Sequence, residues 1–515
     1  MAYLMGIDLG STSTKAVIYD TEGNIAAFAD RPTEIAHLDP EHPTWAFWEP
    51  QKVWNDTVAV IKDALAKLPN ASDLKGVAVT GMGMDGVPVD KDGQWLYPFI
   101  SWHCPRTEPQ SRAWSEKVGA ENIYLISGKQ VMPIDTVYRL LWMQENHPDI
   151  LEKTDKWLLI EDFVNFMVCG RQATDYTMAS CTSLFDQKAL RWSEKLFADA
   201  NIPLELFPEP LASGTPLGEV TAEAAALTGL AQGTPIILGG HDYVCAALAV
   251  GAFKPGVVMD VTGTWEIVSQ SSSDLILNTT MFEAGLIVES HVAKNTYLTS
   301  AYSPSALMLE WFRDQYGSEE KALQQQTGKS EWASFMEQAA TVPCGSNGVF
   351  FLPHFAGVGA PYNDNRALGA FVGLSMAADK AGMIRAMIEG LDYQFRDLVE
   401  AMEGALRIQS PKIVAVGGAS RNSFWMQNKA DVTGKIIEVP GMDEATTLGA
   451  ALLAGIGVGV YQDEQDAYQN TFEAGKTYEP NMSLKARYDT YFKLYKEVYS
   501  SLKTVNWQIF DEFRK

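Results

Sequence analysis

The stretch GIDLGSTSTKAVIYD, residues 6–20, decides the fold. An apolar run carries Asp8 near its end, a glycine turn with hydroxyl residues follows, and a second apolar run completes the pattern. This order predicts a strand, a tight polar turn and a second strand. Backbone N–H groups and hydroxyls in such a turn can hold phosphate oxygens, and a carboxylate at the strand end can hold Mg²⁺ directly or through water. A plain hairpin with a polar turn is the alternative for this stretch taken alone.

The stretch VMDVTGTWEIVSQ, residues 258–270, repeats the same design. An apolar strand carries Asp260, the sequence Thr262-Gly263-Thr264 predicts the turn, and a further strand follows. Two such units about 250 residues apart indicate duplicated halves. Each half would offer one turn to phosphate groups, so that a nucleotide would be clamped between them. The repeat therefore favours a phosphate site over a plain hairpin.

A third turn lies in VAVGGASRNSFWMQNKADVTG, residues 414–434. The pattern predicts a strand, a turn at Gly417-Gly418 and then a helix. Backbone without side chains lets a planar base and a ribose approach closely. The alternative is simple capping of the helix by Ser420 or Asn422.

The stretch VAVTGMGMDG, residues 77–86, ends in a formal G-x-G-x-x-G pattern. A dinucleotide-binding turn of this kind needs a helix directly after the third glycine. Here GVPVDKDGQWLYPFISW follows, which predicts two strands joined by a turn. We therefore expect no NAD site, and we expect these glycines to let the chain turn close to a small ligand.

Length and composition bound the class of protein. The 515 residues predict two large domains, and GAFKPG at residues 251–256 places the boundary between residues 1–248 and 249–515. The net charge of −24 disfavours nucleic acid and anionic membranes as partners. Five scattered cysteines without a C-x-x-C pattern argue against disulfides and a zinc site. With no predicted signal peptide or long apolar span, a soluble cytoplasmic enzyme is expected. Residues 107–235 are expected to be mainly helical.

Together these motifs resemble the FGGY carbohydrate kinase family, whose members include xylulokinases and glycerol kinases. The resemblance covers nearly the whole chain and implies an α/β fold with two ribonuclease H-like domains around a central interdomain cleft, as in actin, hexokinase and the heat-shock ATPases. Ten motifs stand in the family order: GIDLGSTSTKAVIYD, ISWHCPRT, TVYRLLWMQ, EDFVNFMVCG with TDYTMAS, LGGHDYVCAAL, VTGTWE, FLPHFAGVGAP, RAMIEG, GGASRNSFWMQNKADVTG and EATTLGAALLAG.

The resemblance implies transfer of the γ-phosphoryl group of Mg·ATP to a hydroxyl of a ketose, or of a related sugar or polyol. Asp8 matches the family's metal-supporting aspartate, and Asp242 in GGHD matches its catalytic base. One carboxylate that accepts the hydroxyl proton is what in-line phosphoryl transfer needs. Helix capping is the alternative role for Asp242, and a solvated surface charge is the alternative for Lys15. The expected ATP-binding residues are Gly10, Ser11, Thr12, Ser13, Lys15, Gly263, Thr264, Gly417, Gly418 and Asn422.

The expected sugar pocket departs from the family pattern. Met84-Asp85-Gly86 stands where xylulokinases resemble a Met-His-Gly run and glycerol kinases an Arg-Glu pair, and His103-Cys104 replaces the usual Asn/Gln-Asp. We expect Asp85 to accept hydrogen bonds from sugar hydroxyls, which disfavours glycerol and leaves D-xylulose in question. His241 is expected either to bond the substrate or tune the base, or to be a packed histidine. The expected substrate-binding residues are Met84, Asp85, Trp102, His103, Arg106, His241 and Asp242.

Two further departures concern the frame around this pocket. Arg139 stands where the family signature has Lys, a change we expect the fold to tolerate. The segment FAGVGAP lacks the family's Glu-Arg pair at Val358-Gly359, which could alter domain closure.

Two other functions fit the same fold: an actin- or chaperone-like ATPase, and a non-catalytic sugar-binding regulator. The sequence has no C-terminal β-rich module, which disfavours the first. It retains Asp8, Thr264 and Asp242, which disfavours the second. The sequence leaves open which sugar and which hydroxyl are used, and whether the chain forms the homodimer that occurs in the family.

Overall fold

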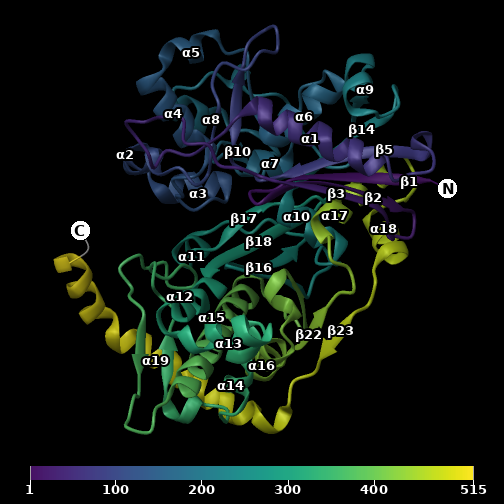
Figure 1. Cartoon of the computed structure of the whole chain (residues 1–515). Helices are drawn as coiled ribbons and strands as arrows, with labels where there is room; N and C mark the ends of the chain where they lie inside the picture. The colour runs from purple at the N-terminus through teal and green to yellow at the C-terminus, as the bar shows by residue number, and fades with distance from the viewer. Residues whose placement is uncertain (1, 514–515) are drawn as a thin grey trace.

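A computed structural model describes residues 2–513 and shows two lobes, each built on a mixed β-sheet (Figure 1). In the first lobe the strand order is β13-β14-β5-β1-β2-β3. In the second lobe it is β17-β18-β16-β15-β21-β22-β23. The strands of the first sheet are β1 (Tyr3–Leu9), β2 (Ser13–Asp20), β3 (Ile25–Pro32), β5 (Leu74–Gly81), β13 (Pro216–Glu219) and β14 (Pro235–His241). Those of the second are β15 (Val257–Thr262), β16 (Trp265–Ser272), β17 (Ile287–Ser290), β18 (Tyr297–Pro304), β21 (Lys412–Val416), β22 (Ile436–Val439) and β23 (Lys476–Tyr478).

The two sheets repeat one topology. In the first lobe, β3, β2 and β1 are antiparallel neighbours, and β5 and β14 then continue the sheet parallel to β1. In the second lobe, β18, β16 and β15 are antiparallel neighbours, and β21 and β22 continue parallel to β15. The duplicated α/β halves predicted from the two strand–turn–strand units are therefore confirmed.

The region of residues 107–235 is mainly helical, as expected, although short two- to four-residue strands interrupt it. Its helices are α2 (Glu108–Val118), α3 (Ala120–Ser127), α4 (Thr136–Asn146), α5 (Pro148–Lys153), α6 (Ile160–Cys169), α7 (Tyr176–Ser180), α8 (Glu194–Ala200) and α9 (Ala222–Thr228), and α1 (Pro50–Leu65) precedes them. The short strands before this region are β4 (Phe47–Trp48), β6 (Gly86–Val89) and β7 (Phe99–Ile100), and those within it are β8 (Lys156–Leu159), β9 (Thr174–Asp175), β10 (Phe185–Asp186), β11 (Arg191–Trp192) and β12 (Pro210–Leu211).

The G-x-G-x-x-G stretch opens a strand and not a helix, because β6 begins at Gly86 and pairs with β8. A Cβ atom added at Gly86 would lie 2.0 Å from Trp157 Nε1. Close packing therefore explains this glycine, and the segment lacks the helix that a dinucleotide turn requires.

Two helices lie between the sheets and share one apolar core with both. They are α10 (Asp242–Ala249), which follows β14, and α17 (Ala445–Gly457), which follows β22. Their core includes Leu4 and Ile237 of the first sheet and Met259 and Val414 of the second. A Cβ added at Gly449 would lie 1.9 Å from the carbonyl oxygen of Cys245, so the glycine permits the close crossing of α10 and α17. Because α17 belongs to the second half yet packs on β1, β5 and β14, the division at 248/249 stays a prediction.

Long helices complete the second lobe. The helix α15 is buried along most of its length, and α19 lays the buried rings of Tyr488, Phe492, Tyr495 and Tyr499 against the lobe before its far end projects (Figure 1). The helices are α11 (Thr279–Glu283), α12 (Ala306–Tyr316), α13 (Ser318–Thr327), α14 (Glu331–Ala340), α15 (Lys380–Leu406), α16 (Ser423–Thr433), α18 (Glu464–Thr471) and α19 (Met482–Phe513), with the small strands β19 (Phe350–Leu352) and β20 (Ala370–Val372).

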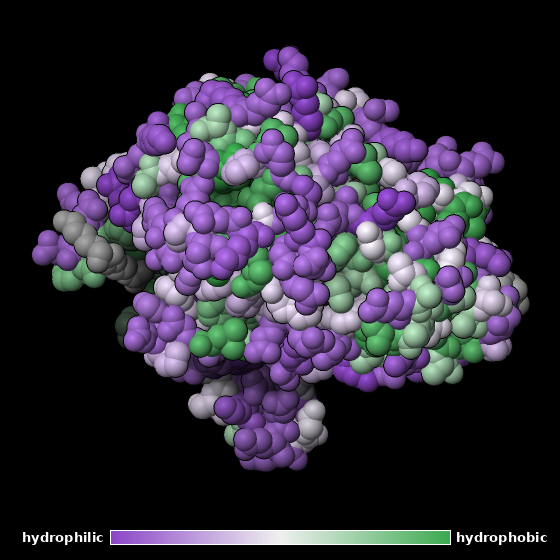
Figure 2. Space-filling view, turned by 90° about the horizontal axis from the view of Figure 1, so that it is seen from above, coloured by the Kyte–Doolittle hydropathy of each residue, from purple (hydrophilic) through white to green (hydrophobic). Residues whose placement is uncertain are grey.

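The surface is mostly polar. Hydrophilic residues dominate the face seen from above, and apolar residues are scattered between them in small groups (Figure 2). Within residues 2–513 no helix combines the length and apolar character needed to cross a membrane.

Candidate active site

The first sheet brings Asp8 and Asp242 together at the carboxyl end of its parallel strands. Strand β5 lies between β1 and β14, and all three are parallel. Thr80 is the register partner of Asp8 on one side and of Gly240 on the other. Two inter-strand spacings of about 4.8 Å therefore separate the backbones that deliver the two carboxylates. The carboxyl end of parallel strands is where α/β sheets commonly bind ligands.

Asp242 is the more accessible of the two carboxylates. It is the first residue of α10, the cap position falls on His241, and its side chain is 37% exposed. The Tyr243 N–H donates to Asp242 Oδ1 (2.5 Å), so the carboxylate also satisfies a backbone donor at the start of α10, and its role as catalytic base stays a prediction. Burial raises the pKa of Asp242, His241 lowers it, and the charge of Glu289 raises it further. The start of a helix favours the ionised carboxylate, and this form can accept a proton.

Asp8 is buried and carries an unused oxygen. Burial raises its pKa to about 8; the charge of Asp242 adds to the shift, Lys15 opposes it and Glu444 adds a smaller contribution. Within the described chain, Asp8 Oδ1 has no hydrogen-bond partner. A buried carboxylate oxygen beside a second carboxylate is a position that a cation stabilises. The side chains present therefore fit a divalent metal ion at Asp8.

The first expected phosphate turn joins β1 to β2. The Gly10 N–H donates to the Ser13 carbonyl (3.2 Å), and Thr12 is exposed at the tip. Lys15 Nζ lies 2.8 Å from Glu444 Oε2, and its side chain is only one-quarter exposed. Lys15 is therefore an anchored cation near Asp8 and not a freely solvated charge.

The second expected phosphate turn joins β15 to β16, with Thr264 exposed at its tip. Beneath it, the fully buried Lys429 of α16 donates to Asp260 Oδ2 (2.5 Å) and Glu266 Oε1 (2.6 Å). It also contacts Thr262 Oγ1 at 3.2 Å. Asp260 is thus neutralised by a lysine, unlike Asp8 in the first half. Lys429, which the sequence analysis missed, fixes both strands that flank this turn.

The expected adenosine turn packs directly on the second phosphate turn. Gly417 has φ +92°, and a Cβ there would lie 2.6 Å from the carbonyl oxygen of Thr262. A Cβ at Gly418 would meet no atom within 4 Å, so this side of the turn is open. Asn422 caps α16 by accepting a hydrogen bond from Trp425 N (3.1 Å). The capping alternative is therefore confirmed for Asn422, and its contact with adenosine stays a prediction.

Asp85 does not offer a free carboxylate to a sugar. Its side chain is fully buried, Arg139 Nη2 donates to Oδ1 (2.8 Å), and Trp48 Nε1 donates to Oδ2 (2.6 Å). The backbone N–H of Trp102 also donates to Oδ2 (3.1 Å). This position disagrees with the expectation that Asp85 accepts hydrogen bonds from sugar hydroxyls. The carboxylate instead holds the Met84–Gly86 segment to α4 and to residues 101–102.

The other expected substrate residues of the first lobe lie around this buried pair. The rings of Trp102 and His103 stack with centroids 3.8 Å apart, and His103 is exposed. Arg106 is buried, with its guanidinium 4.1 Å from the ring centroids of both Trp45 and Phe47. Arg106 Nη2 is buried and has no hydrogen-bond partner in the part of the chain that the structure describes. It is thus a rigidly held donor with unused capacity.

His241 lies between groups from both lobes. Its Nε2 is 3.6 Å from Asp242 Oδ1, and its Nδ1 is 3.3 Å from Cys181 Sγ and 3.6 Å from Glu289 Oε2. The imidazole is 7% exposed. The packed-histidine interpretation therefore fits the structure, and the base-tuning interpretation stays a prediction. The sequence analysis identified neither Cys181 nor Glu289.

Comparison with known proteins decides the family. The N-terminal domain of the FGGY family of carbohydrate kinases matches residues 3–249, and its C-terminal domain matches residues 258–458. This chain belongs to the FGGY family. Its fold is accordingly the two-domain, actin-like ATPase fold, and it is a carbohydrate kinase with ATP as phosphoryl donor.

Relatives of this FGGY kinase carry different names. L-fuculokinase of Escherichia coli (strain K12) is 29% identical over 464 residues, covering 90% of this chain and 94% of that protein. Autoinducer-2 kinase of Yersinia pestis is 31% identical over 524 residues, covering 98% and 93%. The crystal structure of xylulose kinase from Rhodospirillum rubrum matches with a TM-score of 0.88 at 26% identity, covering 98% of this chain and 99% of that one. The similarity therefore fixes the family and leaves the acceptor sugar open.

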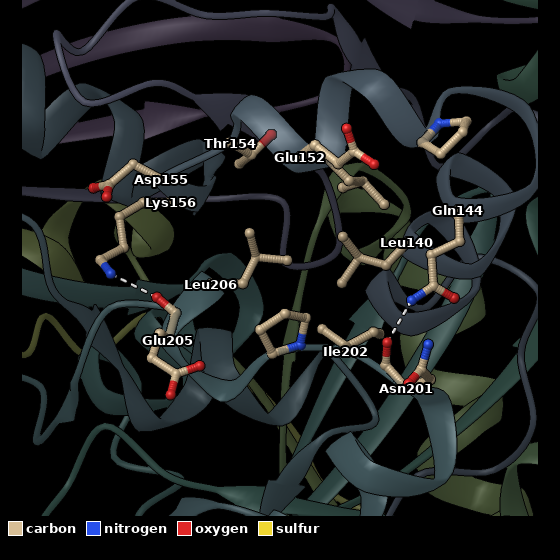
Figure 3. A pocket seen from close by; sticks show the side chains of 13 residues that line it. Leu140, Gln144, Glu152, Thr154, Asp155, Lys156, Asn201, Ile202, Glu205 and Leu206 are labelled. Atoms are coloured by element: carbon tan, nitrogen blue, oxygen red, sulfur yellow. Dashed lines mark hydrogen bonds between the residues drawn. The ribbon is translucent and has the colours of Figure 1, made fainter.

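A separate cavity of the FGGY kinase lies away from these residues. It has a volume of about 570 Å³ and is lined from α4, α5 and the segment around Asn201–Leu206 (Figure 3). Leu140, Ile202 and Leu206 form its apolar floor, and Gln144 donates to the Asn201 carbonyl (2.7 Å) at one side. None of the expected catalytic, nucleotide or sugar residues lines it. The expected site residues therefore lie apart from this cavity.

Proposed function

We propose that this FGGY kinase transfers the γ-phosphoryl group of Mg·ATP to a hydroxyl of a ketose, or of a related sugar or polyol, with Asp242 as general base. The observation that carries the proposal is the position of Asp242. Its carboxylate is partly exposed at the carboxyl end of the first sheet's parallel strands, where Asp8 and the first phosphate turn also lie. A base must reach the acceptor proton while the acceptor oxygen faces the γ-phosphate.

In this mechanism Asp242 accepts the proton of the sugar hydroxyl as the oxygen attacks the γ-phosphorus in line. The bond from that phosphorus to the β–γ bridging oxygen breaks, and ADP leaves. The protein contributes position and charge, since phosphoryl transfer needs little covalent help. The nucleotide phosphates would lie between the Gly10–Ser13 turn and the Gly263-Thr264 turn, with Lys15 as the nearby cation.

Asp8 would hold Mg²⁺ through its unpartnered Oδ1, directly or through water. When bound, the ion neutralises charge on the transferring phosphates. A nearby cation would also favour the ionised form of a carboxyl whose pKa is otherwise raised.

The first lobe would provide the sugar wall. The stacked Trp102–His103 pair offers an amphipathic face, and the unused Nη2 of Arg106 offers a donor to a sugar oxygen. Asp85 would hold this wall in place by accepting a hydrogen bond from the Trp102 N–H and by its ion pair with Arg139. Adenosine would lie on the Gly417-Gly418 turn, on the open side of Gly418.

The test is ADP release from Mg·ATP across a panel of ketoses, polyols and aldonates. Asp242→Asn keeps the size of the side chain and removes the base, so we expect it to lose about 10²- to 10⁴-fold in kcat. Asp379→Asn is the matched control, because Asp379 caps α15 by accepting from Gly382 N (2.8 Å) and Asn caps about equally well. ADP release that needs no sugar would favour the ATPase alternative. Unchanged turnover in Asp242→Asn would contradict the proposed role of Asp242 as general base.

A further inference from the structure

A buried group of side chains connects the second lobe to Asp242, the proposed catalytic base on the first lobe. Glu289 lies on β17, an edge strand of the second sheet, and is fully buried. Its Oε2 faces Nδ1 of His241, which ends β14 of the first sheet, at 3.6 Å. Strand β17 is fastened to the first lobe, because the Val288 N–H donates to the Gly128 carbonyl (2.9 Å). Ser290 Oγ also donates to Gln187 Oε1 (2.9 Å).

The imidazole of His241 has little freedom to turn. Its backbone N–H donates to Thr177 Oγ1 (2.7 Å), and the ring of Tyr243 packs edge-on with centroids 4.8 Å apart. A Cβ added at Gly83 would lie 3.0 Å from His241 Nε2 and 2.4 Å from Cys181 Sγ. The ring therefore presents Nδ1 to the second lobe and Nε2 to Asp242.

Each ring nitrogen lies 3.6 Å from a carboxylate oxygen, within ion-pair range but beyond hydrogen-bond length, and Nδ1 also hydrogen-bonds to Cys181 Sγ (3.3 Å). Only the imidazolium carries a proton on both nitrogens and so can attract both carboxylates. Burial alone would lower the pKa of His241, but Cys181, Glu289 and Asp242 outweigh it and raise the pKa well above its usual value. Burial raises the pKa of the Cys181 thiol and His241 lowers it, and the carboxyl of Glu289 is the second acidic group at Nδ1.

The remaining charges around the cluster offset one another or are absent at neutral pH. Lys129 and Asp135 are both buried, carry opposite charges and attract each other, and Lys129 also acts on Glu289 and Cys181. Burial raises the pKa of Tyr302, so its phenol stays neutral. Asp8 faces Asp242 from β1 and not His241. Glu289 and Asp242 are therefore the carboxyl groups that face the two ring nitrogens.

We propose that Glu289, on the second lobe, is a positioning residue for Asp242, the proposed catalytic base on the first lobe. Glu289 holds His241 as the imidazolium, and His241 directs its Nε2–H at Asp242, which keeps that carboxylate ionised and oriented. This inference rests on the proposed role of Asp242. Asp242 is then held ready to accept a proton only while β17 stays packed against the first lobe. Contact between the two lobes is therefore a condition for catalysis.

A metal ion is the competing occupant of the same cluster. The ligand atoms of Cys181, His241 and Glu289 all lie within 4.8 Å of one another. The buried ammonium of Lys129 already supplies positive charge to Cys181 and Glu289. This positive charge disfavours a divalent metal ion more strongly than a singly charged imidazolium, and the test below separates the two.

The primary experiment measures the titration of His241 itself. The chain has seven histidines, so ring NMR signals of labelled histidine can be resolved and His241 assigned by its loss in His241→Gln. Glu289→Gln keeps size and removes the charge. Removing an anion beside a cationic acid lowers the pKa of that acid, so we expect the His241 pKa to fall by about one unit or more. Cys181→Ser removes the other neighbour of Nδ1 that raises the His241 pKa, so the two variants together separate the contribution of Glu289 from that of Cys181.

Turnover provides the second measurement. The neutral imidazole at high pH keeps a single N–H for two carboxylates, so Asp242 loses its donor in the tautomer that serves Glu289, and kcat should fall on the alkaline side of its pH profile. In Glu289→Gln this alkaline limb should move to lower pH by the same amount as the NMR pKa, with KM for ATP unchanged. In His241→Gln the limb should vanish, which keeps the test decisive if Glu289→Gln does not fold.

Three results would overturn the inference: an unshifted His241 titration in Glu289→Gln, an alkaline limb that persists in His241→Gln, or one equivalent of tightly bound zinc that is lost in both Cys181→Ser and Glu289→Gln. Absence of turnover on every acceptor is a different failure. It would overturn the proposed function, whereas the NMR titration reports on the Glu289–His241 pair without any turnover.

Discussion

Asp85 and Arg139 form a buried ion pair, with Asp85 Oδ1 2.8 Å from Arg139 Nη2 and side-chain exposures of 0% and 2%. Arg139 Nε also donates to the Ile100 carbonyl (2.9 Å), and its guanidinium donates to the Ile134 carbonyl. The pair thus joins α4 to the Met84–Gly86 segment and to the strand before Trp102. It sets the frame on which the proposed sugar wall is built.

Arg139→Met should lower the free energy of unfolding by about 3–5 kcal/mol, because it leaves the Asp85 carboxylate buried and unpaired. Urea denaturation would measure this change. The double variant Asp85→Asn/Arg139→Met should lose less than the sum of the two single variants, since the second change removes the stranded charge. Arg112→Met is the surface control: its pair with Glu108 is 71% and 62% exposed, and we expect little change. Strict additivity at Asp85 and Arg139 would contradict a coupled pair.

This pair also shows what the sequence could and could not predict. The strands, the turns after Asp8 and Thr262, and the duplicated halves were predictable because strand and turn signals are local. The partner of Asp85 lies 54 residues away, and no spacing rule connects the two. Arg139 was recognised as a departure from the family signature, but its ion pair with Asp85 was not.

The same limit applies to the charges buried beneath the site. Lys429 lies more than 160 residues from Asp260 and Glu266, and Glu289 lies 48 residues beyond His241 on the opposite lobe. A charged residue inside an otherwise buried helix or strand is the one signal that the sequence offers, because such groups are rarely buried unpaired. That signal indicates that a partner exists and does not identify it.

Asp8→Asn should stabilise the protein at alkaline pH in the absence of nucleotide and Mg²⁺. The folded pKa of about 8 lies above the usual 3.8, so the folded state holds the proton more tightly than the unfolded state. Stability from this group is therefore present below pH 4 and is lost as pH rises to 8, by up to about 5 kcal/mol. Urea denaturation at pH 5 and pH 8 should show the advantage of Asp8→Asn growing with pH. A constant difference between the two proteins would contradict the raised pKa, and Mg·ATP should stabilise the wild type more than the variant.

Gly418→Ala should weaken ATP binding without weakening the fold. An added Cβ meets no atom within 4 Å and needs no positive φ, so the free energy of unfolding should change by less than about 0.5 kcal/mol. The methyl group would occupy the open side of the turn, where the base and ribose are proposed to lie, and KM for ATP should rise about tenfold. Gly404→Ala on α15 is the control, because it also meets nothing within 4 Å and lies inside a helix. An equal KM for ATP in both variants would place adenosine elsewhere.

Gly83→Ala should reduce kcat by displacing His241, since the new Cβ would lie 2.4 Å from Cys181 Sγ and 3.0 Å from His241 Nε2. Distances this short require one of the two side chains to move. We expect at least about a tenfold loss of kcat, because the imidazole then leaves its place beside Asp242. Cys181→Ala alone should retain most of the turnover, and combining it with Gly83→Ala should restore part of the loss by freeing the space that Sγ fills. Measuring kcat for the two single variants and the double variant gives their coupling, expected at about 1 kcal/mol or more. A double variant no better than Gly83→Ala alone would show that Cys181 is not what makes a glycine necessary at this position.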